Sequence, residues 1–294
     1  MDEKYAARFE ALAKTIWAKD KEVVLIVGDF VYGSAIRDPL KFSGAFSGIT
    51  SLAGQQKIIR LAKQHGREVW FDVHVGTDGP RPDAAFAGMF SFVSALERIA
   101  DGARFQVAVF EFNAGNHSQK RALANSLAIN AIERDGRIPI AASANCLQPD
   151  RQNDNGWDQG LLFLNPSRVW LQPPGYVTQV VARNYQPKLV GCEVSGQKGN
   201  LDANAKLSED GKTLVLQVVN PTDTAVTVRI RITGFTPIKP EAQATDLSGP
   251  LDAINLAGKT DAIVPRQNAW ERQINNGSTI RTFPACSFTV LRLE

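Results

Sequence analysis

The feature that most constrains the fold is a regular exchange between two hydrophobic patterns over about the first 185 residues. Stretches with apolar residues at helical spacing alternate with short, nearly continuous apolar runs. These runs are EVVLIVGDF, REVWFDVHVG, RFQVAVFEFNAG and RIPIAASANC. A parallel sheet that is covered by helices accommodates strands that are apolar throughout. The pattern therefore predicts four βα units.

A different pattern begins near residue 188. The segment 212–234 holds two alternating runs, and in the second Val226, Val228 and Ile230 share one face while Thr227 and Arg229 share the other. The last ten residues, ACSFTVLRLE, read as another strand of the same kind. We therefore predict a barrel-like domain over 1–187 and an antiparallel β-sandwich over 188–294.

Composition excludes several classes of protein. The net charge of +3 is spread along the chain, so we expect neither a nucleic-acid partner nor a membrane partner. No apolar run approaches the ~20 residues of a membrane span, and the start of the chain reads as an amphipathic helix rather than a signal peptide, which makes the cytoplasm the default expectation. Three widely spaced cysteines predict buried free thiols.

Ionisable side chains stand at the ends of three successive predicted strands. Asp29 closes the first, Asp72 and His74 share a face at the end of the second, and Glu111 ends the third. On a strand Glu111 shares its face with Val107 and Val109, away from Phe110 and Phe112, which suit the helix-covered side. The carboxyl ends of barrel strands are where such enzymes place their chemistry. Each residue also has a structural reading, as an ion-paired loop acid, a helix cap or a histidine bonded to backbone.

Carboxylates in this position suggest glycoside hydrolysis, in which one acid is the nucleophile and a second acts as acid and then base. The sequence lacks the GxSxG, GxGxxG and P-loop motifs of rival classes. A metal held by Asp72, His74 and Glu111 is an alternative, although no HExxH-type spacing supports it and we expect no cofactor. Neither His65 nor His117 is assigned a catalytic role.

Six blocks stand in a fixed order along the chain: VWFDVHVG, VAVFEFNAG, RALANSLAINAIERDG, IPIAASANC, the stretch 155–186 and PACSFTVLRL. In order and spacing they resemble the C-terminal half of glycoside hydrolase family 51 α-L-arabinofuranosidases. The resemblance implies half of a (β/α)8 TIM-type barrel followed by a β-sandwich, and retaining hydrolysis of arabinose-decorated plant polysaccharides or oligosaccharides. It also implies that Glu111 is the nucleophile, with His74, Asp72, Asn113 and Trp157 at the substrate-binding rim.

One element of the family pattern is missing. The acid/base glutamate of the family follows an asparagine, and no Asn-Glu dipeptide occurs in these 294 residues. We therefore expect a truncated enzyme that self-associates or is completed by an N-terminal half-barrel. Local substitutes for the acid would be Asp29, Asp150 or Asp154. The glycine- and serine-rich segment 31–54 could shield an open sheet edge or form part of the substrate rim.

Two other functions stay open at this stage. One is a non-catalytic carbohydrate-binding remnant, and the other is a glycosidase of the same clan that cleaves xylans or glucans. Hydrolysis of an aryl arabinofuranoside separates the catalytic from the non-catalytic reading, and metal analysis tests the metalloenzyme.

Overall fold

The computed structural model describes residues 2–28, 52–78, 82–151, 158–196, 200–236, 239, 241–271 and 278–294. Two compact units divide the chain. Unit 1 comprises residues up to Phe112 together with Asp135–Ser143, and unit 2 comprises Asn113–Arg134 together with Ala144–Glu294. The domain boundary at residue 187 stays a prediction. Asp29, Asp154, Trp157 and nearly all of the segment 31–54 lie outside the described residues.

Unit 1 is built from parallel strands and helices that alternate along the chain. Its elements are α1 (Asp2–Lys19), β1 (Leu25–Val27), α2 (Ala53–Gln64), β2 (Val69–Gly76), α3 (Pro82–Ala100), β3 (Phe105–Asn113) and β4 (Ala141–Ser143). The sheet order β1-β2-β3-β4 follows the chain order, and the β1–β2 and β3–β4 pairs are parallel. The four predicted βα units are thereby confirmed, although β4 is shorter than the predicted run.

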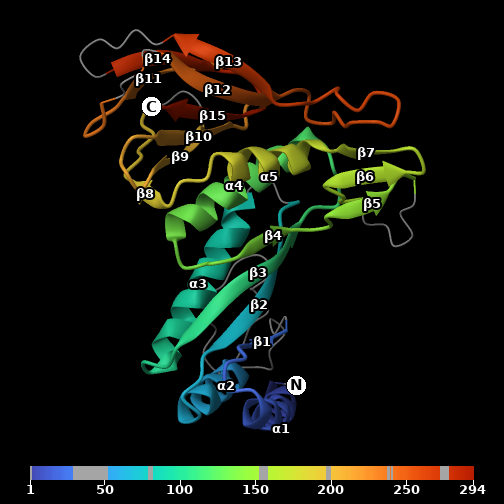
Figure 1. Ribbon diagram of the computed structural model, residues 1–294, viewed down its shortest axis with the longest axis vertical. Helices are drawn as coiled ribbons and strands as arrows, with labels where there is room; N and C mark the ends of the chain where they lie inside the picture. The colour runs from blue at the N-terminus through green and yellow to red at the C-terminus, as the bar shows by residue number, and fades with distance from the viewer. Residues whose placement is uncertain are drawn as a thin grey trace. The chain divides into compact units, whose positions relative to one another are not determined.

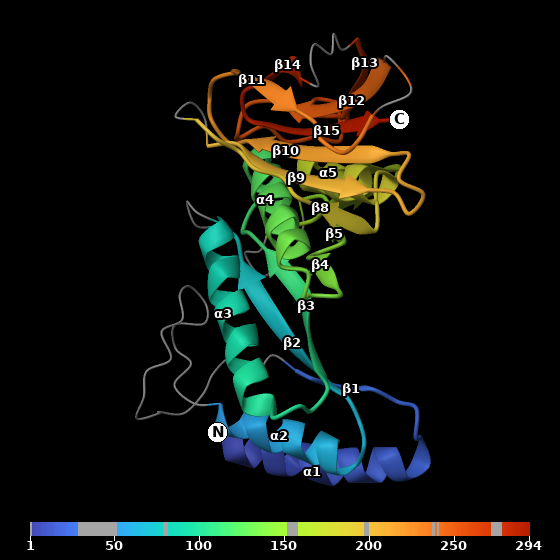
Figure 2. The same ribbon diagram turned by 90° about the vertical axis from the view of Figure 1, so that its left-hand side faces the viewer.

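The alternating burial of β2 shows how the sheet of unit 1 is covered. Val69, Phe71 and Val73 are at most 1% exposed, whereas the residues between them are half-buried. Helix α3 lies along β2 in both views (Figures 1 and 2) and brings Phe86 and Met89 against the sheet. The half-buried residues of β2 therefore lie on the face away from α3, where their side chains can contact a bound molecule, as the period-two pattern predicts.

Unit 2 centres on a six-stranded sheet of order β13-β12-β15-β10-β9-β8. Its members are β8 (Lys188–Val190), β9 (Asp202–Leu207), β10 (Leu214–Asn220), β12 (Glu241–Ser248), β13 (Arg266–Glu271) and β15 (Ser287–Leu293). All its neighbouring pairs are antiparallel. A second sheet of β11 (Val226–Arg231) and β14 (Ser278–Phe283) packs on one face, which completes the β-sandwich (Figure 2).

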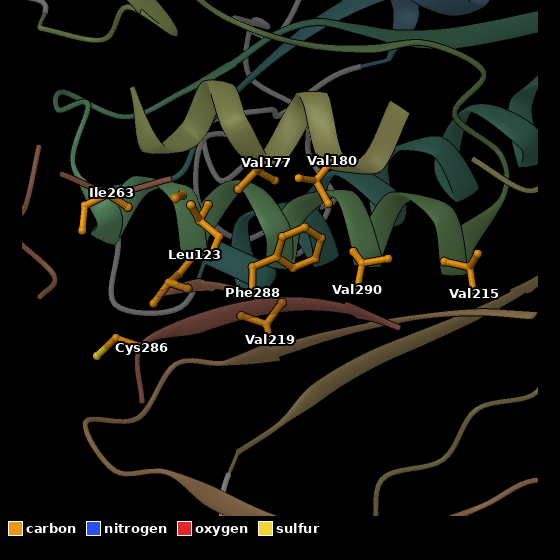
Figure 3. Close-up of a cluster of buried hydrophobic side chains, with 11 residues drawn as sticks. Leu123, Val177, Val180, Val215, Val219, Ile263, Cys286, Phe288 and Val290 are labelled. Carbon is orange, nitrogen blue, oxygen red and sulfur yellow. The ribbon is translucent and has the colours of Figure 1, made fainter. Parts of the chain in front are cut away.

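Helices cover the other face of the six-stranded sheet. These are α4 (Gln119–Asp135) and α5 (Pro173–Arg183), and their side chains Leu123, Val177 and Val180 meet Phe288 and Val290 of β15 (Figure 3). The sequence pattern groups both helices with the barrel. Their apolar residues form one core with the inner faces of β10 and β15.

A small third sheet precedes α5. It consists of β5 (Leu147–Pro149), β6 (Leu162–Asn165) and β7 (Arg168–Leu171). Cys286 is buried as predicted, but Cys146 is exposed, so the prediction of buried thiols is wrong there. Cys146 stands next to a short strand at the edge of this sheet, where little chain covers it. No helix among the described residues is long and apolar enough to cross a membrane.

Candidate active site

Three of the predicted residues meet in unit 1. Asp72 and His74 point from the half-buried face of β2, and Glu111 lies near the end of β3. The Nε2 atom of His74 lies 3.1 Å from Oδ2 of Asp72, and its Nδ1 atom lies 3.6 Å from Oε2 of Glu111. The imidazole therefore stands between two carboxylates at the carboxyl ends of neighbouring strands.

Asp72 anchors this group. Its Oδ1 atom accepts a hydrogen bond of 3.3 Å from the backbone N–H of Phe110, which is the residue before Glu111. Its other oxygen faces His74, so one carboxylate fixes both the backbone of β3 and the imidazole ring. Each ring nitrogen of His74 thus faces a carboxylate oxygen, Nε2 that of Asp72 and Nδ1 that of Glu111.

The exposed fraction differs among the three side chains, and Asp72 is the least exposed. Asp72 is 14% exposed, Glu111 34% and His74 40%. The anchoring carboxylate is thus the most enclosed, while Glu111 keeps access to solvent and to a bound molecule. Phe112, the next residue on β3, is 2% exposed and packs edge-to-face on Phe86 of α3, which sets Glu111 on the opposite side from the helix.

The remaining predicted rim residues are placed differently. Asn113 is the last residue of β3 and the first residue of unit 2. Trp157 lies outside the described residues. Of the three candidate acids, only Asp150 is described, in the turn after β5, where its backbone N–H donates to the carbonyl oxygen of Leu164.

The metal alternative does not fit the geometry. Within the described ranges, no group of three or more His, Cys, Asp or Glu side chains is arranged to hold a metal ion. In particular, the two nitrogens of His74 face two different carboxylates, so the three residues surround the ring rather than a common point. This geometry does not support a metal centre at these three residues.

A contact between a buried histidine and a half-buried acid in unit 2 has no signal in the sequence pattern. His117, which precedes α4, lies with Nδ1 3.0 Å from Oδ2 of Asp158, and its ring centroid is 4.6 Å from that of Phe163. Burial lowers the pKa of His117 below its usual range, and the neighbouring Asp158 partly offsets this effect. The two residues are far apart in sequence, and no periodic pattern connects them.

Arg121 joins three backbone segments near this pair. The guanidinium is fully buried and donates to the backbone carbonyl oxygens of Asn116, Gln159 and Ala144. Three carbonyl groups from three separate segments thus share one cation. The arrangement joins the start of α4 to the chain just after Trp157.

The fold and the acids at its strand ends define the class of protein. Helix-covered parallel strands that carry carboxylates at their carboxyl ends, joined to a β-sandwich, form a glycoside hydrolase-like architecture. Residues 111–287 match the model of the α-L-arabinofuranosidase C-terminal domain, which covers more than half of the chain. The chain therefore belongs to the α-L-arabinofuranosidase C-terminal domain family.

Solved structures agree on the fold. The thermostable family 51 α-L-arabinofuranosidase from Thermotoga petrophila RKU-1 superposes with a TM-score of 0.77 at 17% identity, covering 100% of this chain and 62% of that one. The enzyme from Thermotoga maritima, solved as an arabinose complex, gives 0.74 at 16%, covering 100% and 62%. A family 44 xyloglucanase from Paenibacillus polymyxa gives 0.66 at 10%, covering 99% and 61%.

These comparisons also set the extent of the match. The chain spans 62% of the length of the two Thermotoga enzymes. No curated protein sequence matched the chain.

Proposed function

We propose that this chain carries the nucleophile side of a retaining α-L-arabinofuranosidase active site, with Glu111 as the nucleophile. The observation that carries the proposal is the placement of Glu111 beside His74 and Asp72 at the carboxyl end of the parallel sheet. Membership of the family supports the choice of chemistry. The substrates are arabinofuranosyl groups on plant polysaccharides or oligosaccharides.

Glu111, Asp72 and His74 would have different roles in this reaction. In a retaining hydrolase the nucleophile bonds covalently to the anomeric carbon, and the leaving group departs as that bond forms. Glu111 supplies the attacking oxygen. Asp72 and His74 are positioning residues, because Asp72 holds the imidazole ring and the backbone next to Glu111 in one orientation. Asn113 and Trp157 are assigned to the rim that binds the sugar.

The acid that protonates the leaving group is the missing half of the mechanism. Because the 294 residues contain no Asn-Glu pair, and a second copy of the chain has the same sequence, we propose that a complementing N-terminal half-barrel supplies this residue. The sheet of unit 1 offers a surface for it, since β1 and β4 are edge strands and Ile26 of β1 is 48% exposed. A chain that is strictly monomeric in light scattering would contradict the self-association that the same open edges predict.

The chemical nature of the leaving group determines how strongly the rate of hydrolysis depends on this acid. General acid catalysis contributes roughly 100- to 10,000-fold, and an activated aryl group departs with little help from it. The purified chain should therefore release 2,4-dinitrophenol from the aryl α-L-arabinofuranoside while leaving natural arabinan almost untouched. Glu111→Gln should abolish that release.

The matched control is Glu22→Gln, which makes the same chemical change at an exposed position of unit 1. It should retain the activity of the unmodified chain. Equal activity of Glu111→Gln and Glu22→Gln would refute the assignment of the nucleophile. Aryl xylosides and glucosides belong in the same assay, because they test the xylan- or glucan-cleaving alternative, and a xyloglucanase shares this fold.

The absence of an Asn-Glu pair also favours a second candidate, a non-catalytic carbohydrate-binding protein. This function predicts saturable binding of arabino-oligosaccharides in calorimetry without release of dinitrophenol. Release that depends on Glu111 would exclude it.

A further inference from the structure

The six-stranded sheet of unit 2 is covered unequally on its two faces. On the side of α4 and α5, Val215 and Val219 of β10 are fully buried. On the opposite side, toward β11 and β14, Leu214 and Leu216 of the same strand are only half-buried. Two strands cannot cover six, so apolar surface between the sheets stays accessible.

This surface forms a groove of about 480 Å³. Its floor is apolar and comes from β9 and β10, including Ala205, Leu207 and Leu214. One wall is the segment 190–195, and the other is the run 228–235. Because consecutive residues of β11 line the groove, the edge of that strand borders it rather than one face alone. The volume is many times the ~30 Å³ that one water molecule occupies.

Only one edge of β11 is paired with another strand in the described part of unit 2. That edge pairs with β14 over the whole strand, from Val226 opposite Phe283 to Arg231 opposite Ser278. In the described part of the chain, no strand pairs with the edge that lines the groove. Such an edge presents a row of N–H and C=O groups that template the addition of another strand.

The side chains of β11 specify what that strand would carry. Val228 and Ile230 face the groove and are half-buried, while Arg229 and Arg231 are exposed between them. Neither arginine has an ion-pair partner among the residues that the structure describes. Glu193 lies on the opposite wall, so the positive charge is confined to the side of β11.

We propose that this groove binds an extended polypeptide segment that adds a strand to the free edge of β11. Its apolar residues fill the space above β9 and β10, and its alternate residues are acidic and lie beside Arg229 and Arg231. The six residues of β11 accommodate a partner about 20 Å long. Backbone hydrogen bonds provide affinity, and the alternating side chains provide specificity. The inference does not depend on the proposed hydrolase activity.

Two fluorescein-labelled peptides test the proposal on the full chain. They have the sequences SVEVEVS and SVKVKVS, which differ only in the charge of the alternate residues. Opposite charges across strands contribute roughly 0.2–1 kcal/mol per pair, so two pairs predict a preference for the acidic peptide on the order of ten-fold in anisotropy titrations. The variant Arg229→Glu/Arg231→Glu should reverse the preference.

The matched control is Lys259→Glu/Arg266→Glu, which changes charge equally at exposed positions of unit 2 away from the groove. It should keep the preference of the unmodified chain, and circular dichroism melting verifies that both variants fold. Hydrogen exchange should slow in β11 when the acidic peptide binds, and not in the edge strand β13.

Three results would overturn the proposal. The first is no saturable binding of either peptide, and the second is an unchanged preference in the β11 variant. The third is protection of β11 in a concentration-dependent dimer without peptide, which would assign the edge to a second copy of the chain.

Discussion

The attachment of α4 to the sandwich gives a stability prediction that can be worked out from contacts. Lys206 of β9 is only 3% exposed, and its Nζ donates to Oε1 of Glu133 on α4 at 2.6 Å and to Oε1 of Gln217 at 3.1 Å. The ring of Tyr185 lies 5.9 Å away. Glu133→Ala would leave the ammonium group buried with only the Gln217 oxygen as an acceptor.

Removing one partner of a buried pair typically costs about 3–5 kcal/mol, because the remaining charge is uncompensated. Glu133 is 21% exposed, so water can reach the space that it vacates, and we expect the lower end, about 3 kcal/mol. In a unit of this size that corresponds to a drop in melting temperature of ~6–12 °C. Differential scanning calorimetry of unit 2 within the full chain measures it.

Two comparisons sharpen the test. The double variant Glu133→Leu/Lys206→Met removes both charges and should recover at least half of the loss. The surface pair of Glu209 with Lys188 is 74% and 47% exposed, and Glu209→Ala should cost no more than about 1 kcal/mol. If Glu133→Ala and Glu209→Ala had equal effects, the buried pair would not join α4 to the sheet as described.

Three further changes have defined outcomes. Burial lowers the pKa of His117, so the residue takes up a proton when the chain unfolds at acidic pH. The free energy of unfolding should therefore fall as the pH drops below about 6.5, by up to ~1.4 kcal/mol per pH unit. The variant His117→Gln should flatten this dependence in urea titrations. Gly175→Ala places a Cβ 2.5 Å from the carbonyl oxygen of Leu161 and should lower the melting temperature, whereas Gly191→Ala meets no atom within 4 Å and should not. Asp72→Ala frees the imidazole and should reduce kcat for the aryl substrate at least 10-fold, which the isosteric Asp72→Asn should partly restore.

The spacing of hydrophobic residues predicted the helices and strands well where burial alone determines their bounds. Strand β2 alternates between buried and half-buried residues as its sequence does, and α2 ends at Gln64 before Gly66, whose φ of +65° suits the glycine that the sequence places there. Both features are local, because each depends on a few neighbouring residues. The placement of Asp72 and His74 on one face of β2 follows from the same alternation.

The partners of the elements were harder to predict. Helix α4 buries polar residues, and Gln119 and Asn130 bond to segments of the sandwich that are distant in sequence. The hydrophobic pattern does not show which sheet α4 packs against, and the polar contacts of Gln119 and Asn130 leave no periodic signal. The contact between His117 and Asp158 could not be predicted from the sequence either, because only the folded chain brings the two residues together.

The central claim is that Glu111 forms a covalent bond to the sugar. Tryptic cleavage after Arg104 and Lys120 yields the peptide 105–120, in which Glu111 is the only carboxylate side chain. After a brief reaction with 2,4-dinitrophenyl α-L-arabinofuranoside and an acid quench, mass spectrometry should find one pentosyl group on this peptide, and none in Glu111→Gln. Release of dinitrophenol with no adduct on peptide 105–120, an adduct on another peptide, or no reaction with this substrate would contradict the account.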